Sequence, residues 1–201
     1  MSSATAPARA RTRIRCSWPS SPISIAYHDR EWGVPLKDDR KLFEFLVLDA
    51  AQAGLSWEII LRKREGFRAA FDDFNAEKIA RYNDKKIKEL LADPGIIRNR
   101  LKIDSTITNA QAFLKIQKEF GSFDKYIWQF VEGKPLQSNL TPDHKMIAST
   151  KLSDTISKDL KNRGFRFVGT TIIYAFMQAT GLVNDHTSDC YRFAALSKPS
   201  K

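Results

Sequence analysis

Apolar side chains along the chain recur every three or four residues, the spacing of an amphipathic helix, and no stretch shows a convincing alternation of period two. The long segment from 96 to 120 illustrates the pattern, because four apolar residues fall on one face: Ile103, Ile107, Ala110 and Leu114. Residues 43–51 are instead apolar almost all round, which is typical of a helix at the centre of a fold. The pattern predicts an all-α protein.

Capping residues and helix breakers set the bounds of the predicted helices. Asp38 and Asp39 can cap a helix that continues to about Ala53. Later helices are expected to begin next to these caps and breakers: Ser56, Asn75, Asp84, Gly95, Ser122, Ser153 and Gly169. The segment 133–151 is polar, contains two prolines and is expected to be a loop.

The two ends of the chain differ from its body. Residues 1–14 are mostly small and polar, carry arginines but no acid, and predict a disordered basic arm, although an organelle transit peptide has a similar composition. Residues 194–201 are expected to form a flexible tail. The 201-residue chain suits one domain, which we place at 15–193.

Composition and charge narrow the class of protein. No apolar run approaches the roughly 20 residues of a membrane span. Two cysteines, 174 positions apart, are too few for a disulfide framework, so we expect a reducing compartment, the cytoplasm, with nucleoid association in a bacterium. The net charge is +10, of which six charges lie in 1–15 and 198–201, so the remaining +4 allows a nucleic-acid partner without requiring one.

Four potential metal ligands lie near the two ends of the body: Cys16, His28, His186 and Cys190. His186 and Cys190 would share one face if their segment is helical. Two thiolates and two imidazoles suit a tetrahedral zinc ion with no open position, which would be structural and would join the first helix to the last. The alternative is a pair of buried cysteines with two ordinary histidines.

Aromatic residues gather in the first 57 positions, where three of the four tryptophans and one notable tyrosine occur: Trp18, Tyr27, Trp32 and Trp57. Such rings usually form core. They could also surround a cavity, because Trp57 follows a tight turn and Tyr27 precedes a potential metal ligand. Flat ring faces would then stack a purine or attract a cation.

Asp49 is the one charged residue in the apolar stretch 45–51. A carboxylate in a helix that is buried all round is costly unless a donor or a cation accompanies it. The partner can be an arginine or a helix N-terminus of the protein, or it can be a ligand.

A six-residue break at 164–169 begins and ends with glycine and separates two predicted helices, 153–163 and 170–180. The second helix would begin with unbonded N–H groups next to Lys161, Arg163 and Arg166, which is an arrangement that binds anions. A helix-hairpin-helix of this kind grips DNA phosphates without reading sequence. An αα-hairpin with a snug turn is the alternative.

Six runs of residues, in order, resemble the 3-methyladenine DNA glycosylase I family, and the resemblance covers about 15–193. They are RCSW at 15–18, IAYHDREWGVP at 25–35, QAGLSW at 52–57, GIIRNR at 95–100, GFRFVGTT at 164–171 and GLVNDH at 181–186. The resemblance implies a helix-hairpin-helix glycosylase fold of two helical lobes, with the hairpin motif at about 153–180. It also implies a structural zinc ion, held by Cys16, His28, His186 and Cys190, that joins the N- and C-terminal segments.

The same resemblance implies roles for individual residues. An extruded 3-methyladenine would occupy a pocket between the lobes, where Trp57 stacks on it, Tyr27 and Asp49 complete the catalytic set, and Trp18 and Trp32 form walls. Leu55 would fill or wedge the gap left in the duplex, and Gly54 beside it on the turn would also contact DNA. The backbone phosphates would be held at the hairpin by Gly169, Thr170, Thr171 and Arg166.

Two positions depart from the family pattern. Asp49 stands where the family usually has a glutamate, so the carboxylate is one methylene shorter and needs either a closer helix or a bridging water. Ser24 stands where members often carry another aromatic residue, which would open the pocket.

The resemblance implies a monofunctional hydrolase that acts as a monomer on alkylated double-stranded DNA, releases free 3-methyladenine and leaves an abasic site. Asp185 sits where other helix-hairpin-helix glycosylases carry a catalytic aspartate, and it stays a secondary candidate. Two alternatives remain open: a damage-binding homologue whose Asp49 no longer supports turnover, and a zinc-dependent hydrolase of a small molecule.

Overall fold

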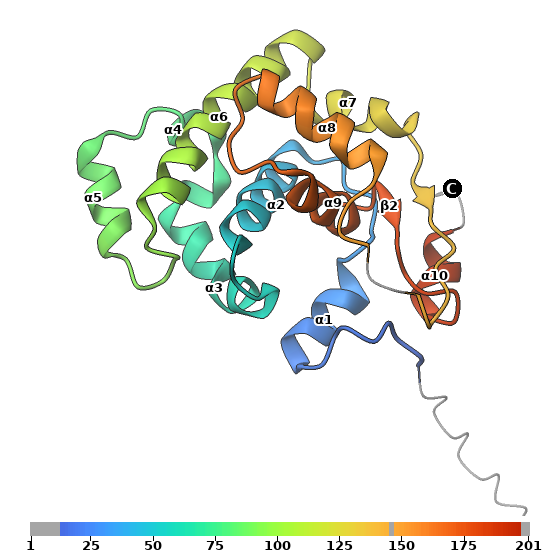
Figure 1. The fold of residues 1–201 in the computed structure, drawn as a ribbon. Coiled ribbons are helices and arrows are strands. Elements are labelled where there is room, and N and C mark those ends of the chain that lie inside the picture. Colours follow the sequence, from blue (N-terminus) through green and yellow to red (C-terminus); the bar gives the residue numbers. More distant parts are fainter. Residues whose placement is uncertain (1–12, 145–146, 198–201) are drawn as a thin grey trace, which may run out of the picture.

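Figure 1 shows a computed structural model of the protein, which describes residues 13–144 and 147–197. These residues are mostly helical, as the hydrophobic pattern predicts. The elements follow in this order: α1 (Pro22–Arg30), α2 (Asp39–Gln52), α3 (Trp57–Ala70), η1 (Asp72–Phe74), α4 (Ala76–Ile79), α5 (Asp84–Ala92), α6 (Arg100–Phe120), α7 (Phe123–Trp128), η2 (Gln129–Val131), β1 (Leu136–Gln137), α8 (Lys151–Asn162), α9 (Thr170–Ala179), β2 (Val183–Asn184) and α10 (Tyr191–Leu196). Across the two described ranges, no helix combines the length and apolarity that crossing a membrane requires.

Helix α2 lies at the centre of the molecule, where it packs against α3, α6, α7 and α9 (Figure 1). Asp38 caps it, as expected, and its side chain accepts from the Lys41 amide. All of residues 42–51 are buried, because neighbours cover every face of this helix. The central position predicted for the apolar stretch is therefore confirmed, and with it the burial of Asp49.

The predicted loop at 133–151 contains a strand that the sequence pattern did not indicate. Strand β1 pairs in parallel with β2, in the register Leu136 to Val183 and Gln137 to Asn184. A strand of two residues is too short to produce a period-two pattern. The pair matters for the site because it holds this loop against the residues that lead to His186.

Three predicted boundaries are wrong. Helix α6 begins at Arg100 rather than next to Gly95, because the Asn99 side chain accepts from the Lys102 amide and caps the helix there. Helix α8 begins after Thr150 rather than Ser153, because the two residues form a capping box in which the Ser153 hydroxyl accepts from the Thr150 amide (2.8 Å). The predicted flexible tail overlaps α10, whose last residues are 194–196. The N-terminal arm is described only from Arg13, and its residue Ile14 accepts a backbone hydrogen bond from Tyr191 (3.0 Å). Predictions for 1–12 and 198–201 lie outside the described residues.

The segment after α1 is fastened to the end of α9. Gly33 donates to the Gln178 carbonyl (3.0 Å), and Leu36 donates to the Thr180 carbonyl (3.0 Å). Gly181 lies against this segment with φ +71, and a Cβ there would lie 2.5 Å from backbone atoms of Val34 and Pro35. These contacts fix the position of α1 relative to α9, and both helices supply residues to the cavity described below.

Replacing Gly181 with alanine is expected to lower the free energy of unfolding by about 2–5 kcal/mol, through left-handed backbone strain and a backbone clash. Gly133→Ala is the matched control, because Gly133 has φ +74 but nothing within 4 Å of the Cβ position. The control should lose only the strain contribution of about 1–2 kcal/mol. Urea unfolding of both variants measures the difference, and equal losses would contradict the clash.

Candidate functional site

A cavity of about 400 Å³ receives side chains from α1, α2, α3 and α9, and every predicted base-pocket and catalytic residue lines it: Trp18, Tyr27, Trp32, Asp49 and Trp57. The residues between 17 and 57 are brought together because α1 and α2 both pack on α3. The volume is in the range of small-molecule sites. Of the two interpretations of the aromatic cluster, the cavity is the one the structure supports.

The four rings contact one another around this cavity. The centroids of Tyr27 and Trp57 are 5.4 Å apart, those of Trp18 and Trp32 are 5.2 Å apart, and those of Trp18 and Tyr27 are 6.2 Å apart. The indole nitrogens of Trp18 and Trp57 are buried and have no hydrogen-bond partner within the described parts of the chain. Buried donors usually have a partner, so these two are available to a bound ligand.

Asp49 is 3% exposed, and its buried Oδ2 has no hydrogen-bond partner among the residues that the structure describes. Burial raises the pKa of this carboxyl well above its ordinary value, and the more distant charge of Arg64 opposes that shift only in part. Arg64 itself is bonded to Glu44 (2.6 Å) and Glu31 (2.7 Å). The described residues therefore provide no close partner for Asp49, which leaves its carboxylate available to a ligand in the cavity.

Asp185 also lines the cavity, but both oxygens of its carboxylate accept hydrogen bonds from neighbours. It accepts from the Tyr174 hydroxyl (2.5 Å), the Gln178 amide (2.7 Å) and the Ser138 hydroxyl. Three donors occupy most of the roughly four acceptor sites of a carboxylate, so few remain for a catalytic role. The contrast with Asp49 is clear, because one buried carboxylate is satisfied and the other is not.

Several lining residues were not predicted: Gln52, Leu140, His144, Tyr174 and Gln178. Three of them lie at helical spacing from predicted site residues, a signal that the sequence contains. Gln52 lies three positions after Asp49, and Tyr174 and Gln178 extend the stripe begun by Thr171 on the otherwise apolar α9. Leu140 and His144 come from the loop after β1, which has no such pattern.

Ser24 does not open the cavity, contrary to expectation. It is buried in the first turn of α1, outside the cavity lining, where its hydroxyl accepts from the amides of Ser20 (3.1 Å) and Ser21 (2.9 Å). The residue completes a capping box with Ser21. The Ser24 hydroxyl therefore stabilises the start of α1.

The turn that carries Gly54 and Leu55 lies between two cavity residues, Gln52 and Trp57. Gly54 is exposed and has φ +76, a left-handed conformation that favours glycine. Leu55 is half-buried and does not line the cavity itself. The turn thus places an apolar side chain next to the cavity without filling it.

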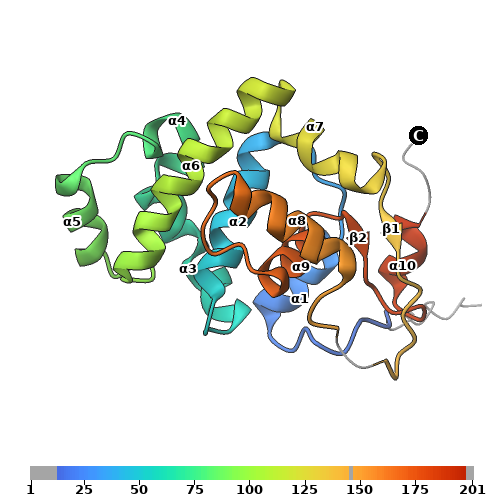
Figure 2. The ribbon, with the colours of Figure 1, turned by 45° about the horizontal axis from the view of Figure 1, so that its top comes forward.

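The break between α8 and α9 folds back onto the core through Phe165 and Val168, which are both buried. Asn109 of α6 holds it by donating to the Arg166 carbonyl (2.9 Å) and accepting from the Arg166 amide (2.7 Å). Gly169 precedes α9 and provides no side-chain cap, so the first amides of the helix have no capping partner. Figures 1 and 2 both show α8 and α9 side by side.

The polar residues of this break are placed as follows. Arg166 and Thr171 are exposed, and Thr171 also lines the cavity. Thr170 bonds to the Ser153 hydroxyl (2.7 Å) and borders a second hollow of about 260 Å³. Arg163 was expected to face an anion, but it is committed to Glu119 (2.8 Å) and Asp159, so that part of the prediction is wrong. The acid that neutralises it lies four residues earlier on α8, a helical neighbour that the sequence analysis did not weigh.

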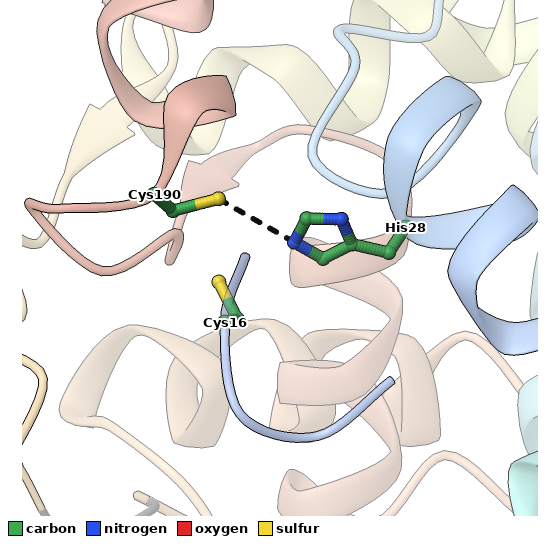
Figure 3. Close-up of side chains that lie close together, drawn as sticks. All are labelled: Cys16, His28 and Cys190. Atoms are coloured by element: carbon green, nitrogen blue, oxygen red, sulfur yellow. Dashed lines mark hydrogen bonds between the residues drawn. The ribbon is translucent and has the colours of Figure 1, made fainter. Parts of the chain in front are cut away.

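Three of the four predicted metal ligands meet in space. The ligand atoms of Cys16, His28 and Cys190 lie within 4.8 Å of one another, and all three residues are buried (Figure 3). They come from the segment before α1, from α1 and from the N-cap of α10. His186 is outside this group, although its ring centroid lies 5.0 Å from that of His28. The segment between His186 and Cys190 is a turn rather than the helix considered above.

The hydrogen bonds around the two histidines direct both Nε2 atoms inward. His28 Nδ1 bonds to Asp29 (2.9 Å), and His186 Nδ1 bonds to Asn184 (3.0 Å). The buried Nε2 of His186 has no partner in the described structure. Burial, with the nearby His28, lowers the pKa of His186 to about 3, so its ring is neutral at pH 7, as a metal ligand must be.

Comparisons with known proteins show which family the chain resembles. A family model described as methyladenine glycosylase matches residues 17–193. The "DNA-3-methyladenine glycosylase 1" of Escherichia coli K12 is 49% identical over 177 residues, which cover 88% of this chain and 95% of the relative.

Two solved structures are also similar. A crystal structure of 3-methyladenine DNA glycosylase I superposes with a TM-score of 0.86 at 49% identity, covering 89% of this chain and 98% of its own. A variant of 3-methyladenine DNA glycosylase I in complex with 3-methyladenine has a TM-score of 0.85 at 37% identity, covering 88% and 96%.

Proposed function

The chain belongs to the methyladenine glycosylase family, and from this membership we propose that it removes 3-methyladenine from alkylated DNA. The reaction is hydrolysis of the N-glycosidic bond, which releases the free base and leaves an abasic site for base excision repair. One observation carries the proposal: the cavity combines aromatic walls with a single buried carboxylate, Asp49, that has no close partner in the described protein.

The charge of the substrate explains why these groups suit it. Methylation at N3 makes the adenine of the nucleotide cationic, which weakens the glycosidic bond and improves the leaving group. Aromatic faces attract a cation, and Asp49 supplies the opposite charge, so the cavity favours the lesion over neutral adenine. Extruding a damaged base costs a few kcal/mol, less than for an intact pair. Trp57 then stacks on the base, Tyr27 closes the pocket beside it, and Trp18 and Trp32 complete the walls.

The same cavity supports a monofunctional reaction. Among the described residues that line it there is no lysine, so no amine is placed to form a Schiff base with the sugar. The three donors on Asp185 argue against this residue as the general base. Water therefore attacks C1′ while the pocket holds the departing base.

The DNA contacts follow from the elements beside the cavity. We propose that α8, the break and α9 form a helix-hairpin-helix between two helical lobes, in which Gly169, Thr170 and Thr171 bind phosphate at the uncapped start of α9 and Arg166 adds charge. Leu55, presented by the turn at Gly54, fills the gap that the extruded base leaves. We further propose that the chain acts as a monomer on duplex DNA in the cytoplasm, at the nucleoid in a bacterium. The relative's name, a DNA glycosylase, supports DNA as the substrate.

We also propose a structural zinc ion held by Cys16, His28, His186 and Cys190. The fit rests on spacing: tetrahedral zinc with Zn–S of about 2.3 Å and Zn–N of about 2.05 Å places S and N about 3.6 Å apart. Cys190 Sγ and His28 Nε2 are 3.6 Å apart. The unpartnered Nε2 of His186 supplies a fourth donor close by. An ion there leaves no open position for hydrolysis and joins the segment before α1 to α10.

The proposed activity is tested by incubating the full chain with methylated duplex DNA and separating the released bases by chromatography. Release of 3-methyladenine well above the rate without protein is expected, together with abasic sites that alkali cleaves. Release equal to the spontaneous rate would overturn the proposal. If an abasic duplex then still binds and Asp49→Glu restores release, the chain is a damage-binding homologue.

Replacing Trp57 with alanine is expected to weaken binding of free 3-methyladenine by about 1–3 kcal/mol, because one stacking face is lost. Calorimetric titration with the free base measures the change. Trp57→Phe keeps a smaller ring and should recover part of the affinity. Trp128→Phe is the matched control, since Trp128 is buried outside the cavity. Unchanged affinity in Trp57→Ala would contradict the stacking role.

A further inference from the structure

The turn between α2 and α3 leaves the last carbonyls of α2 without helical partners. Three consecutive carbonyls are nevertheless bonded. The Leu55 amide donates to the Gln52 carbonyl (2.6 Å). The ammonium of Lys102, on α6, donates to the carbonyls of Ala51 (2.8 Å) and Ala53 (2.7 Å). Lys102, about fifty positions later in the chain, thus binds the C-terminal end of α2, the helix that carries Asp49.

Lys102 is built into the structure rather than extended over the surface. Its own carbonyl accepts from the hydroxyls of Ser105 (2.8 Å) and Thr106 (2.9 Å), which are both buried. Burial lowers the pKa of the Lys102 ammonium, and the carbonyls at the negative end of α2 compensate for the lost hydration. Two of its three N–H donors are committed to these carbonyls, which is unlike a lysine that binds phosphate from solvent.

Apart from the Leu55 amide bond, the Ser56 cap of α3 and the packing of Leu55 at the edge of the core, few described contacts hold the turn in shape. Gly54 is exposed, and the position that a Cβ would occupy there has nothing within 4 Å. Leu55 is only half-buried. We infer that Lys102 is a positioning residue, which holds the Gly54–Leu55 turn in the conformation that lets Leu55 fill the gap in the duplex. This inference rests on the proposed function, because a wedge is needed only where a base is extruded.

The test is Lys102→Met, which keeps the stem and removes the ammonium. We expect kcat/KM for base release from methylated duplex to fall about tenfold or more, since a misplaced group near the reaction costs up to about a hundredfold. Affinity for free 3-methyladenine should stay within about twofold, because the base contacts lie in the cavity and not in the turn. Lys102→Arg, which retains donors for both carbonyls, should recover most of the release.

Lys115→Met is the matched control, because Lys115 is an exposed lysine on the same helix. It should leave release unchanged. The salt dependence of binding to an abasic duplex separates a positioning role from a phosphate contact. Losing a phosphate-bound lysine lowers the slope of log affinity against log salt by about 1, whereas Lys102→Met should keep the slope of the unmodified chain.

Amide hydrogen exchange supplies a readout that does not depend on activity. The Leu55 amide should exchange at least about tenfold faster in Lys102→Met, while the core amide of Leu46 keeps its protection. Unchanged Leu55 protection, a lowered salt slope, or an equal loss of free-base affinity would each overturn the inference. Should Lys102→Met fail to fold, Lys102→Gln carries the same test. If the unmodified chain releases no base, the proposed function and the wedge role fall together, and the exchange result alone decides whether Lys102 holds the turn.

Discussion

Replacing Asp49 with asparagine is expected to lower release of 3-methyladenine by about a hundredfold or more and, at the same time, to stabilise the protein. Removing one member of a buried charge pair costs about 2–5 kcal/mol, and in this cavity the other member is the cationic base. Asparagine has almost the same shape, so the loss reports charge rather than packing. Base release and thermal unfolding of the same preparation measure the two effects.

The gain in stability follows from the raised pKa of Asp49. Burial raises its folded-state pKa above the unfolded value of about 3.9, so the native state binds more protons than the unfolded state between these two values. The stability that protonated Asp49 contributes at low pH is therefore lost as pH rises from the unfolded-state pKa to the folded-state pKa. The amide of the Asp49→Asn variant does not ionise and carries no such cost, so the Tm advantage of this variant should grow as pH rises. Release by the unmodified chain should increase over the same window, because the ionised carboxylate pairs with the base.

Asp185→Asn is the informative comparison. Asp185 lines the same cavity, but three donors already satisfy it, so its replacement should destabilise the protein where Asp49→Asn stabilises it. Opposite signs in Tm would show that one carboxylate is reserved for a ligand and the other supports the fold. A lower Tm for Asp49→Asn, or release at the unmodified rate, would contradict the role assigned to Asp49.

The fold was predictable from the sequence wherever the hydrophobic pattern belongs to a single helix. The apolar stretch 43–51 predicted a central helix because burial on all faces removes the polar positions that surface helices need. The pairing of β1 with β2 could not be predicted, since two residues carry no period and the partner lies 47 positions away. Arg163 pairs with two acids that its nearby charges do not reveal: Asp159, four residues earlier on α8, and Glu119 of α6, which only folding brings near.

The sequence alone indicated which residues form the site better than it indicated what each of them does. Its apolar surroundings and its charge alone predicted that Asp49 needs a partner, and the described residues supply none. Whether the tryptophans formed core or cavity depended on how α1 packs on α3, which spacing does not specify. The roles of Leu55 and Trp57 came from family resemblance. The position of His186 relative to Cys190 could not be predicted, because the sequence did not decide whether the segment between them is a helix or a turn.

Replacing Cys190 with serine is expected to release zinc and to lower the Tm by about 10 °C or more. Structural zinc contributes about 10–16 kcal/mol of apparent binding free energy in small zinc domains, comparable with the whole stability of a folded protein. Serine is nearly isosteric but gives no thiolate, so the change removes one ligand and little packing. Metal analysis of the purified chain and thermal unfolding measure the two effects. Retained zinc would refute Cys190 as a ligand.

The double variant Cys16→Ser/Cys190→Ser separates a metal site from two independent buried thiols. With a shared ion, the first substitution already releases it, so the second should add little and the losses should fall well short of additive. Two thiols that only pack should instead give modest losses that sum. Chelation gives the same contrast without mutation: the unmodified chain should lose stability in a strong chelator, whereas either single variant should not respond. A chelator effect that persists in Cys190→Ser would place the metal elsewhere in the protein.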